Sequence, residues 1–161
     1  MTATPIPRSL QLTIFGDLDI SIINQMPKGR TPIKTRIYNE LNLKDVIYPE
    51  LSAHLAAGEQ VYIICRLIDE AISDEDKSRT VIETAKLMQK QFSKYQIGIL
   101  HGKLKPAEKD QVMQDFKDKK TQILVSTTVV EVGVDVPNAT QIVILNADRY
   151  GLAQLHQLRG R

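Results

Sequence analysis

The sequence predicts an α/β fold with a doubly wound, mainly parallel sheet and helices on both faces. Short apolar runs rich in Ile and Val, without polar alternation, are typical of parallel strands buried on both faces. Segments with apolar residues three and four positions apart, typical of amphipathic helices, separate these runs. This alternation favours right-handed crossovers within one sheet. With 161 residues and 42% hydrophobic content, the chain is long enough for one compact domain.

Four short runs are predicted to be the strands of this sheet. They cover residues 61–65, 96–100, 122–126 and 141–145. Cys65, the one cysteine of the chain, lies in the first run, where we expect it to fill core volume. A lone cysteine cannot form an intrachain disulfide, which favours a reducing, cytoplasmic location. No segment approaches the roughly 18 uninterrupted apolar residues of a membrane span, and the N-terminus lacks a secretory pattern.

Two amphipathic helices are predicted between the strands. The first covers residues 78–95, and its apolar stripe consists of Val81, Ile82, Ala85, Met88 and Phe92. The second begins at Pro106, because proline suits a first helical turn, where its missing N–H is not needed. Its apolar stripe consists of Val112, Met113 and Phe116. Both stripes are expected to face the sheet.

Residues 1–58 are predicted to be a connector leading into the sheet. Three short strands are expected there, over residues 10–14, 19–23 and 35–38. A helix is expected over residues 43–57, with Pro49 marking either a kink or its true start and Gly58 ending it. Further along, the acidic residues 73–77 are expected to form a solvated loop.

Two segments imitate nucleotide-binding motifs but lack a part that the chemistry needs. Residues 29–35, G-R-T-P-I-K-T, carry Ile33 where a phosphate-binding loop needs glycine, and its Cβ would crowd the phosphate. Asp69 and Glu70 follow an apolar run like a Mg²⁺-binding carboxylate pair. Without a phosphate loop before them, the Mg²⁺ would have no nucleotide to bridge. An ordinary turn and a solvated loop are therefore the preferred interpretations.

Charge and metal-ligand content exclude two further kinds of site. Lys plus Arg exceeds Asp plus Glu by only 21 to 19, so there is no overall basic field and any nucleic-acid contact must be local. The three histidines have no Cys or carboxylate partners at ligand spacing, so no metal site is expected. They are His54, His101 and His156.

Residues 126–137, S-T-T-V-V-E-V-G-V-D-V-P, carry the strongest functional signal. They begin at the end of a predicted strand with Ser126 and Thr127, pass through a turn that contains Gly133, and place Asp135 shortly before a proline. Open α/β sheets bind ligands at the carboxyl ends of their strands, where hydroxyls and free backbone N–H groups can face a phosphate. We therefore expect a ligand site at this edge.

Five motifs in a fixed order give the chain a family resemblance. They are residues 2–8, 16–19, 101–106, 126–137 and 151–161. Together they resemble the second motor domain of superfamily 2 DNA translocases, whose fold is RecA-like, and they are most similar to the RecG branched-DNA helicase family. The Mfd type of transcription-repair coupling translocase shares the T-A-T-P opening and the G-L-A-Q-L-H-Q segment near the end, and it remains an alternative.

The resemblance implies roles in an ATP site between two RecA-like domains. Arg161 would be the first of two arginines that approach the γ-phosphate, and Gln157 would help to orient that region. Asp135 would face the ribose, while Gly133 would let the backbone pass close by. An alternative role for Asp135 is to cap a turn before Pro137.

The resemblance also implies roles in DNA binding. Ser126 and Thr127 would hold the phosphate backbone of the tracked strand, and helix N-capping is their alternative role. Backbone N–H groups at His101 and Gly102 would meet a DNA phosphate, against the alternative of a structural strand-end histidine. Further phosphate neighbours would be Arg66 and Lys103. Residues that couple nucleotide state to DNA grip would be Thr2, Thr4 and Arg8.

The resemblance implies that the chain is one part of a larger helicase. Residues 1–58 would connect from a first motor domain, and residues 59–161 would form the second RecA-like domain, truncated within the sixth motif. The parent would be an ATP-dependent DNA helicase acting on forks and junctions in repair and recombination. It would use ATP and Mg²⁺, neither held by this part alone, and the partners of this part would be DNA and the parent's first motor and wedge domains. Alone, the chain is expected to be inert as an enzyme, and self-association through surface exposed by truncation stays open.

Two alternatives belong to other functional classes. A stand-alone, non-hydrolysing nucleic-acid-binding module with the same fold would bind DNA without a partner domain. A small nucleotidase using Lys34 with Asp69 and Glu70 would turn over ATP by itself.

Overall fold

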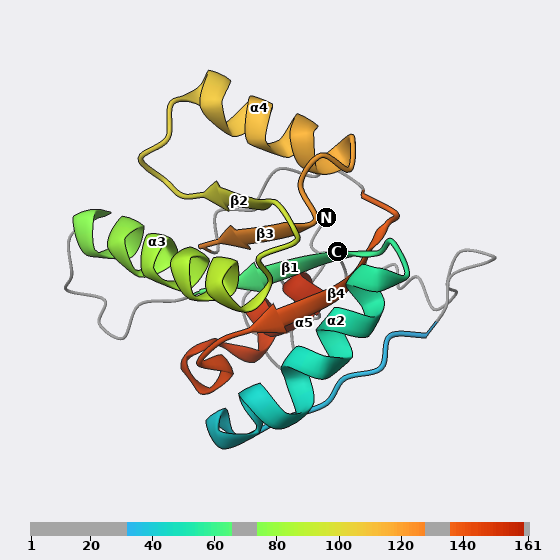
Figure 1. Cartoon of the computed structure of the whole chain (residues 1–161). Helices are drawn as coiled ribbons and strands as arrows, with labels where there is room; N and C mark the ends of the chain where they lie inside the picture. The colour runs from blue at the N-terminus through green and yellow to red at the C-terminus, as the bar shows by residue number, and fades with distance from the viewer. Residues whose placement is uncertain (1–31, 66–73, 128–135, 160–161) are drawn as a thin grey trace, which may run out of the picture. The chain divides into compact units, whose positions relative to one another are not determined.

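Four parallel strands form the sheet of the described chain, in the order β2-β3-β1-β4 (Figure 1). The computed structural model describes residues 32–65, 74–127 and 136–159. The strands are β1 (Gln60–Ile64), β2 (Ile97–Leu100), β3 (Ile123–Ser126) and β4 (Ala139–Ile144). All four predicted strands are confirmed, with bounds that differ from the predicted ones by at most two residues.

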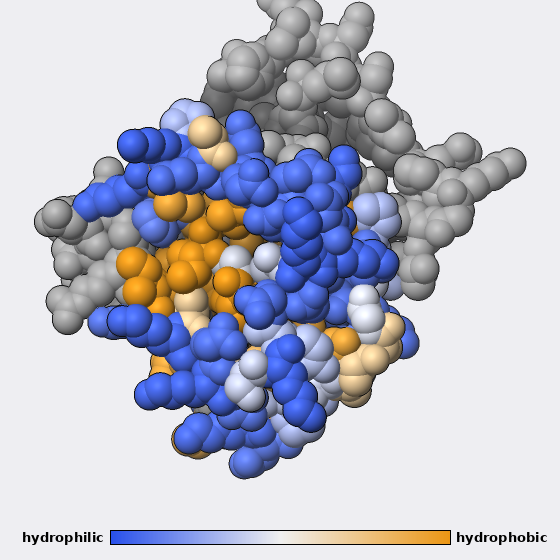
Figure 2. Space-filling model, turned by 45° about the horizontal axis from the view of Figure 1, so that its top comes forward, coloured by the Kyte–Doolittle hydropathy of each residue, from blue (hydrophilic) through white to orange (hydrophobic). Residues whose placement is uncertain are grey.

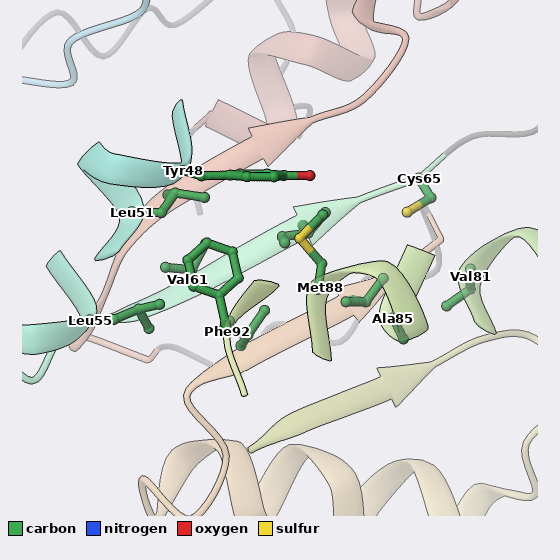
Figure 3. Packing of buried hydrophobic residues seen from close by; sticks show 12 residues of the cluster. Tyr48, Leu51, Leu55, Val61, Cys65, Val81, Ala85, Met88 and Phe92 are labelled. Atoms are coloured by element: carbon green, nitrogen blue, oxygen red, sulfur yellow. The ribbon is translucent and has the colours of Figure 1, made fainter. Parts of the chain in front are cut away.

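Helices α2 (Tyr48–Ala56) and α3 (Asp74–Gln91) pack on one face of this sheet. Their apolar side chains meet alternate residues of β1 and β3, because successive side chains of a strand point to opposite faces. Figure 3 shows this packing over β1, where the rings of Tyr48 and Phe92 lie edge to face with centroids 5.5 Å apart. Each large apolar side chain buried here contributes roughly 1.5–3 kcal/mol.

Helix α4 (Pro106–Lys117) packs on the other face. The ring of Phe116 lies 4.9 Å from that of Tyr62 on β1, measured between centroids. The buried side-chain amide of Gln60 donates to the carbonyl of Phe116 at 2.5 Å and to that of Thr121 at 2.7 Å. These bonds fix the end of α4 to the start of β1. With helices on both faces of a parallel sheet, the predicted fold class is confirmed.

Cys65 lies directly after β1 and is buried in the apolar cluster under α3, as its run of apolar neighbours predicts. Burial raises the pKa of its thiol, and a hydrogen bond with Thr84 acts in the opposite direction. The described structure thus gives this thiol a packing role.

Pro49 explains the winding of the chain before α2. A 3₁₀ turn (Glu40–Asn42) leads into a π-helical turn (Leu43–Ile47), and the α-helix begins only at Tyr48. The N–H of Tyr48 donates to the carbonyl of Leu43, five residues back. Proline has no N–H for an α-helical bond and its ring crowds the carbonyl four residues earlier, so a wider turn is favoured before it. The predicted helix over residues 43–57 is therefore confirmed with Pro49 near the true α start.

Gly58 ends α2 with a φ of 82°, in the left-handed region that glycine adopts without a steric penalty. Its N–H donates to the carbonyl of Leu55 at 3.0 Å. The predicted end of the helix is confirmed.

Two predictions about local structure are wrong. Residues 35–38 form no strand: residues 32–39 are irregular and exposed, and the side chain of Ile37 is 95% exposed. High β propensity does not make a strand without a neighbour to pair and pack with. Residues 74–77 are not a loop but the first turn of α3. Acidic residues suit the start of a helix, because the positive end of the helix dipole stabilises negative charge there. The expected strands over residues 10–14 and 19–23 lie outside the described residues.

Large apolar side chains are exposed at several places among the described residues. Figure 2 shows a largely hydrophilic face with one area where hydrophobic residues gather. The exposed large apolar residues before the sheet include Leu41 at 83% and Val46 at 39% exposed. Within the ranges that the structure covers, no helix combines the length and the apolar character needed to span a membrane.

The described chain divides into two compact units. Residues Tyr38–Tyr150 hold the sheet and the helices α2, α3 and α4, so the helix before residue 58 shares the core of the sheet. The second unit includes helix α5 (Leu152–Arg159), which begins after Gly151. The predicted division of the protein at residue 58 stays a prediction.

Gly98 on β2 gives a test of the packing between β2 and the residues at the start of β3. A Cβ at this position would lie 3.0 Å from both Leu124 Cδ1 and Thr121 Cγ2. Gly98→Ala is therefore expected to lower the free energy of unfolding by about 1–3 kcal/mol, measured by urea denaturation of the 161-residue chain. The control is Gly102→Ala, whose Cβ would have no atom within 4 Å. Equal stability of the two variants would contradict this packing.

Candidate functional site

The carboxyl edge of the sheet brings the ends of its central strands side by side. Leu100, Ser126 and Ile64 are paired across β2, β3 and β1. The ladder continues one step further, because the N–H of Thr127 donates to Leu100 at 3.3 Å and the N–H of Cys65 donates to Ser126 at 2.8 Å. Residues that follow β2 and β3 therefore emerge next to one another. At this edge, the predicted hydroxyl residues Ser126 and Thr127 lie beside the predicted loop at His101 and Gly102.

The two hydroxyl residues at the end of β3 have different surroundings. Ser126 is fully buried, and its hydroxyl donates to the carbonyl of Thr127 at 2.7 Å. Thr127 is half-buried as a residue, but its hydroxyl oxygen is itself buried and has no hydrogen-bond partner among the residues that the structure describes. Thr127 therefore holds the unsatisfied hydroxyl of this pair, while the hydroxyl of Ser126 is bound to the backbone of its neighbour.

The loop after β2 lies open beside this pair. His101 is half-buried, whereas Gly102 and Lys103 are exposed. The N–H of Leu104 donates to the carbonyl of His101 at 3.2 Å and closes a turn. No atom lies within 4 Å of the Cβ position of Gly102, so packing does not require glycine there. The space leaves the backbone accessible to a bound group.

Helix α4 begins directly after this loop with Pro106 in its first turn, as predicted. The carboxylate of Glu108 accepts a hydrogen bond from the N–H of Lys105 at 2.8 Å. Glu108 thus caps the helix with its own negative charge. The negative charge of Glu108 disfavours an anion at the first turn of α4, so the loop at His101–Lys103 is the more favourable place for an anion to bind.

The surroundings of His101 favour its neutral form by lowering its pKa. Desolvation lowers the pKa of its imidazole, the positive charges of Lys103 and Lys109 lower it further, and Glu108 opposes them. Three basic side chains therefore gather at this loop. The sequence analysis missed Lys109, although its position in the first turns of α4 was a signal that it could return toward the loop.

Gln157 lies exposed on α5, two residues before the end of that helix. The helix starts with the N–H of Gly151 bound to the side-chain oxygen of Gln154 at 3.3 Å, and Leu158 is its buried residue. These features belong to the second compact unit.

Seven predicted site residues lie outside the described residues, so their roles stay predictions. They are Thr2, Thr4, Arg8, Arg66, Gly133, Asp135 and Arg161. Within the described part of the chain, no group of three or more His, Cys, Asp or Glu side chains is arranged to hold a metal ion.

The titration of His101 tests the charge arrangement at this edge. Its pKa is expected below the ordinary 6.5, so the ring gains its proton only at more acidic pH than a free histidine. Lys109→Met is expected to raise that pKa, because it removes a nearby positive charge, and NMR titration of the imidazole measures both values. Lys120→Met is the control, since Lys120 pairs with Asp115 at 3.2 Å at the opposite end of α4. Equal shifts in the two variants would contradict the local effect of Lys109.

Comparison with known protein families agrees with this architecture. Residues 42–161 match the family described as the helicase conserved C-terminal domain. Among solved structures, Saccharomyces cerevisiae Dbp5 bound to RNA and ADP BeF3 is similar in fold, with a TM-score of 0.53 and 24% identity. The similarity covers 76% of this chain and 29% of that one.

Curated relatives are similar over the full length of the chain. A protein of Streptococcus pneumoniae named ATP-dependent DNA helicase RecG is 53% identical over 161 residues, which are 100% of this chain and 24% of that protein. Proteins with the same name from Bacillus subtilis and Synechocystis are each 51% identical, and the chain covers 23% and 19% of them. The chain thus spans about a quarter or less of the length of these relatives.

Proposed function

We propose that this chain, which belongs to the helicase conserved C-terminal domain family, forms the second motor domain of a RecG-type, ATP-dependent DNA helicase. The observation that carries this proposal is the 53% identity to a named RecG helicase along the whole chain. The gathering of Thr127, His101 and Lys103 at the ligand-binding edge of a parallel sheet supports it. Forked and branched DNA is the proposed substrate of the parent protein.

DNA binding is assigned to the carboxyl edge. Thr127 and the loop at His101, Gly102 and Lys103 contact phosphates of the tracked strand, with Arg66 as a further neighbour. Such contacts position the strand without reading its sequence. The nearly balanced charge of the chain supports a local contact of this kind. Ser126 supports the contact through its hydrogen bond to Thr127.

ATP hydrolysis is assigned to a cleft that this domain forms with a first motor domain. The first domain binds the ATP phosphates and Mg²⁺, and this domain supplies Asp135 and Gly133 near the ribose. Arg161, oriented with the help of Gln157, stabilises charge on the γ-phosphoryl group. The opening segment with Thr2, Thr4 and Arg8 couples nucleotide state to DNA grip.

The rest of the parent supplies the other partners. Residues 1–58 connect from the first motor domain, and residues 59–161 belong to the second. The exposure of Leu41 and Val46 before the sheet supports a contact with another part of the parent or, in its absence, self-association. A wedge domain of the parent engages the DNA branch, and the parent acts in the cytoplasm.

Lys103→Ala tests the DNA contact. In the full-length enzyme, this variant is expected to bind DNA less tightly and to reduce the slope of log K against log salt by about 0.7–0.9, the share of one phosphate contact. Fluorescence anisotropy at several salt concentrations measures the slope. The matched control is Lys90→Ala, because Lys90 lies in the last turn of α3 and not in the loop after β2 that is proposed to contact DNA. An unchanged slope for Lys103→Ala would place the strand elsewhere.

Arg161→Ala tests the ATP site. The full-length variant is expected to lose roughly 10²–10³-fold in kcat for ATP, as when one preorganised donor to a transition state is removed, with DNA affinity preserved. Steady-state ATPase assays and DNA titrations measure the two properties. Arg149→Ala, which alters an exposed arginine paired with Asp148 at 3.5 Å, is the control. Parallel loss of both properties would instead assign Arg161 to the fold or to the DNA grip.

A further inference from the structure

Gln60, the first residue of β1, places a polar side chain in the core. The residue is 1% exposed, and its amide nitrogen donates to the carbonyl of Phe116 at 2.5 Å and to the carbonyl of Thr121 at 2.7 Å. Because both neighbours are acceptors, the nitrogen of the amide and not its oxygen must face them. One side chain of β1 is therefore bound to two other segments of the chain.

The two carbonyls lie on either side of the turn that joins α4 to β3. Phe116 belongs to the last turn of α4, and Thr121 comes shortly before Ile123, where β3 begins. Within this turn, the N–H of Lys119 donates to the carbonyl of Phe116 at 3.1 Å, and Lys119 has a φ of 61°. The amide of Gln60 thus holds the end of α4 and the approach to β3 at one point of β1.

Packing alone does not require a glutamine at this position. The side-chain oxygen of Gln60 is buried and has no hydrogen-bond partner among the residues that the structure describes. Burial of an unpaired acceptor lowers stability, and a methionine of similar length would fill the same space without that cost. The two donated bonds are therefore the distinctive contribution of this side chain.

The two elements that Gln60 holds lead to the candidate site at their other ends. Helix α4 follows the loop at His101–Lys103, and β3 ends directly before Thr127. Lys109, in the first turns of α4, lowers the pKa of His101, so this end of the helix lies near the loop. A helix of 12 residues is about 18 Å long and moves as a rigid rod. A tilt of α4 at Phe116 is therefore carried to the loop, while β3 stays paired with its two neighbouring strands.

We propose that Gln60 is a positioning residue for DNA binding, because its two hydrogen bonds fix the angle between α4 and β3 and thereby the spacing between the loop at His101–Lys103 and Thr127. This inference rests on the proposed function, in which that loop and Thr127 contact phosphates of one DNA strand. Gln60 itself touches no DNA. It lies at the amino end of β1, whereas the proposed DNA contact lies at the carboxyl edge of the sheet.

The first test follows His101 in the 161-residue chain by NMR titration. Gln60→Met removes both donors and keeps the length of the side chain. Because Lys109 then moves away from the imidazole, the pKa of His101 is expected to rise toward its ordinary value. Gln60→Glu, which keeps one donor in its protonated form, is expected to give a smaller rise. The control is Gln114→Met, which makes the same change at an exposed residue of α4 and removes a 2.8 Å hydrogen bond to Asp118.

The second test measures DNA binding by the full-length enzyme, with fluorescence anisotropy at several salt concentrations. Gln60→Met is expected to weaken binding about fivefold, the effect of one hydrogen bond of ordinary strength. It is also expected to reduce the slope of log K against log salt by about 0.7–0.9, the share of one phosphate contact. Gln114→Met is expected to match the wild type in both properties.

The outcomes distinguish this inference from the proposed function. If Gln60→Met changes neither the pKa of His101 nor the DNA affinity and only lowers Tm, the inference is overturned and the proposed function stands. A change in only one of the two properties would also overturn the inference. If neither Gln60→Met nor Lys103→Ala weakens DNA binding, the proposed DNA contact is wrong as well. If Gln60→Met does not fold, Gln60→Glu replaces it, and the absence of its smaller changes would overturn the inference.

Discussion

The pairing of β1 with β3 is the constraint on which the rest of the structure depends. Both strands are buried on their two faces, and their parallel register brings Ile64 level with Ser126. Parallel strands reach the same edge at their carboxyl ends, so the loops that follow them must share one surface. Helices on either side fill the two cores and leave that edge for ligands. The proposed DNA contact follows from this register.

Much of this fold could be predicted from the sequence because most of its helices and strands have local sequence patterns typical of their type. The apolar runs of all four strands and the first-turn proline of α4 were sufficient to place those elements. Residues 35–38 and 74–77 were misjudged for an equally physical reason. Strand formation depends on a neighbour that a local pattern does not reveal, and acidic residues suit a helix start as well as a loop.

The candidate site was predictable in its location but not in its details. Topology alone places Thr127 beside His101, whereas the burial of Ser126 depends on how the β3 end turns. The approach of Lys109 to His101 depends on the direction in which α4 leaves the loop. The bonds from Gln60 to the carbonyls of Phe116 and Thr121 likewise join distant segments, which no spacing within either segment encodes.

The burial of Cys65 has a practical consequence for future spectroscopy. Thiol reagents attack the thiolate, and this sulfur is both shielded and held in its protonated form by its surroundings. Because the chain has one cysteine, a second cysteine introduced on an exposed loop would react with a maleimide dye or spin label, whereas Cys65 would react very little. Such a label could be attached without first removing the natural thiol from the core.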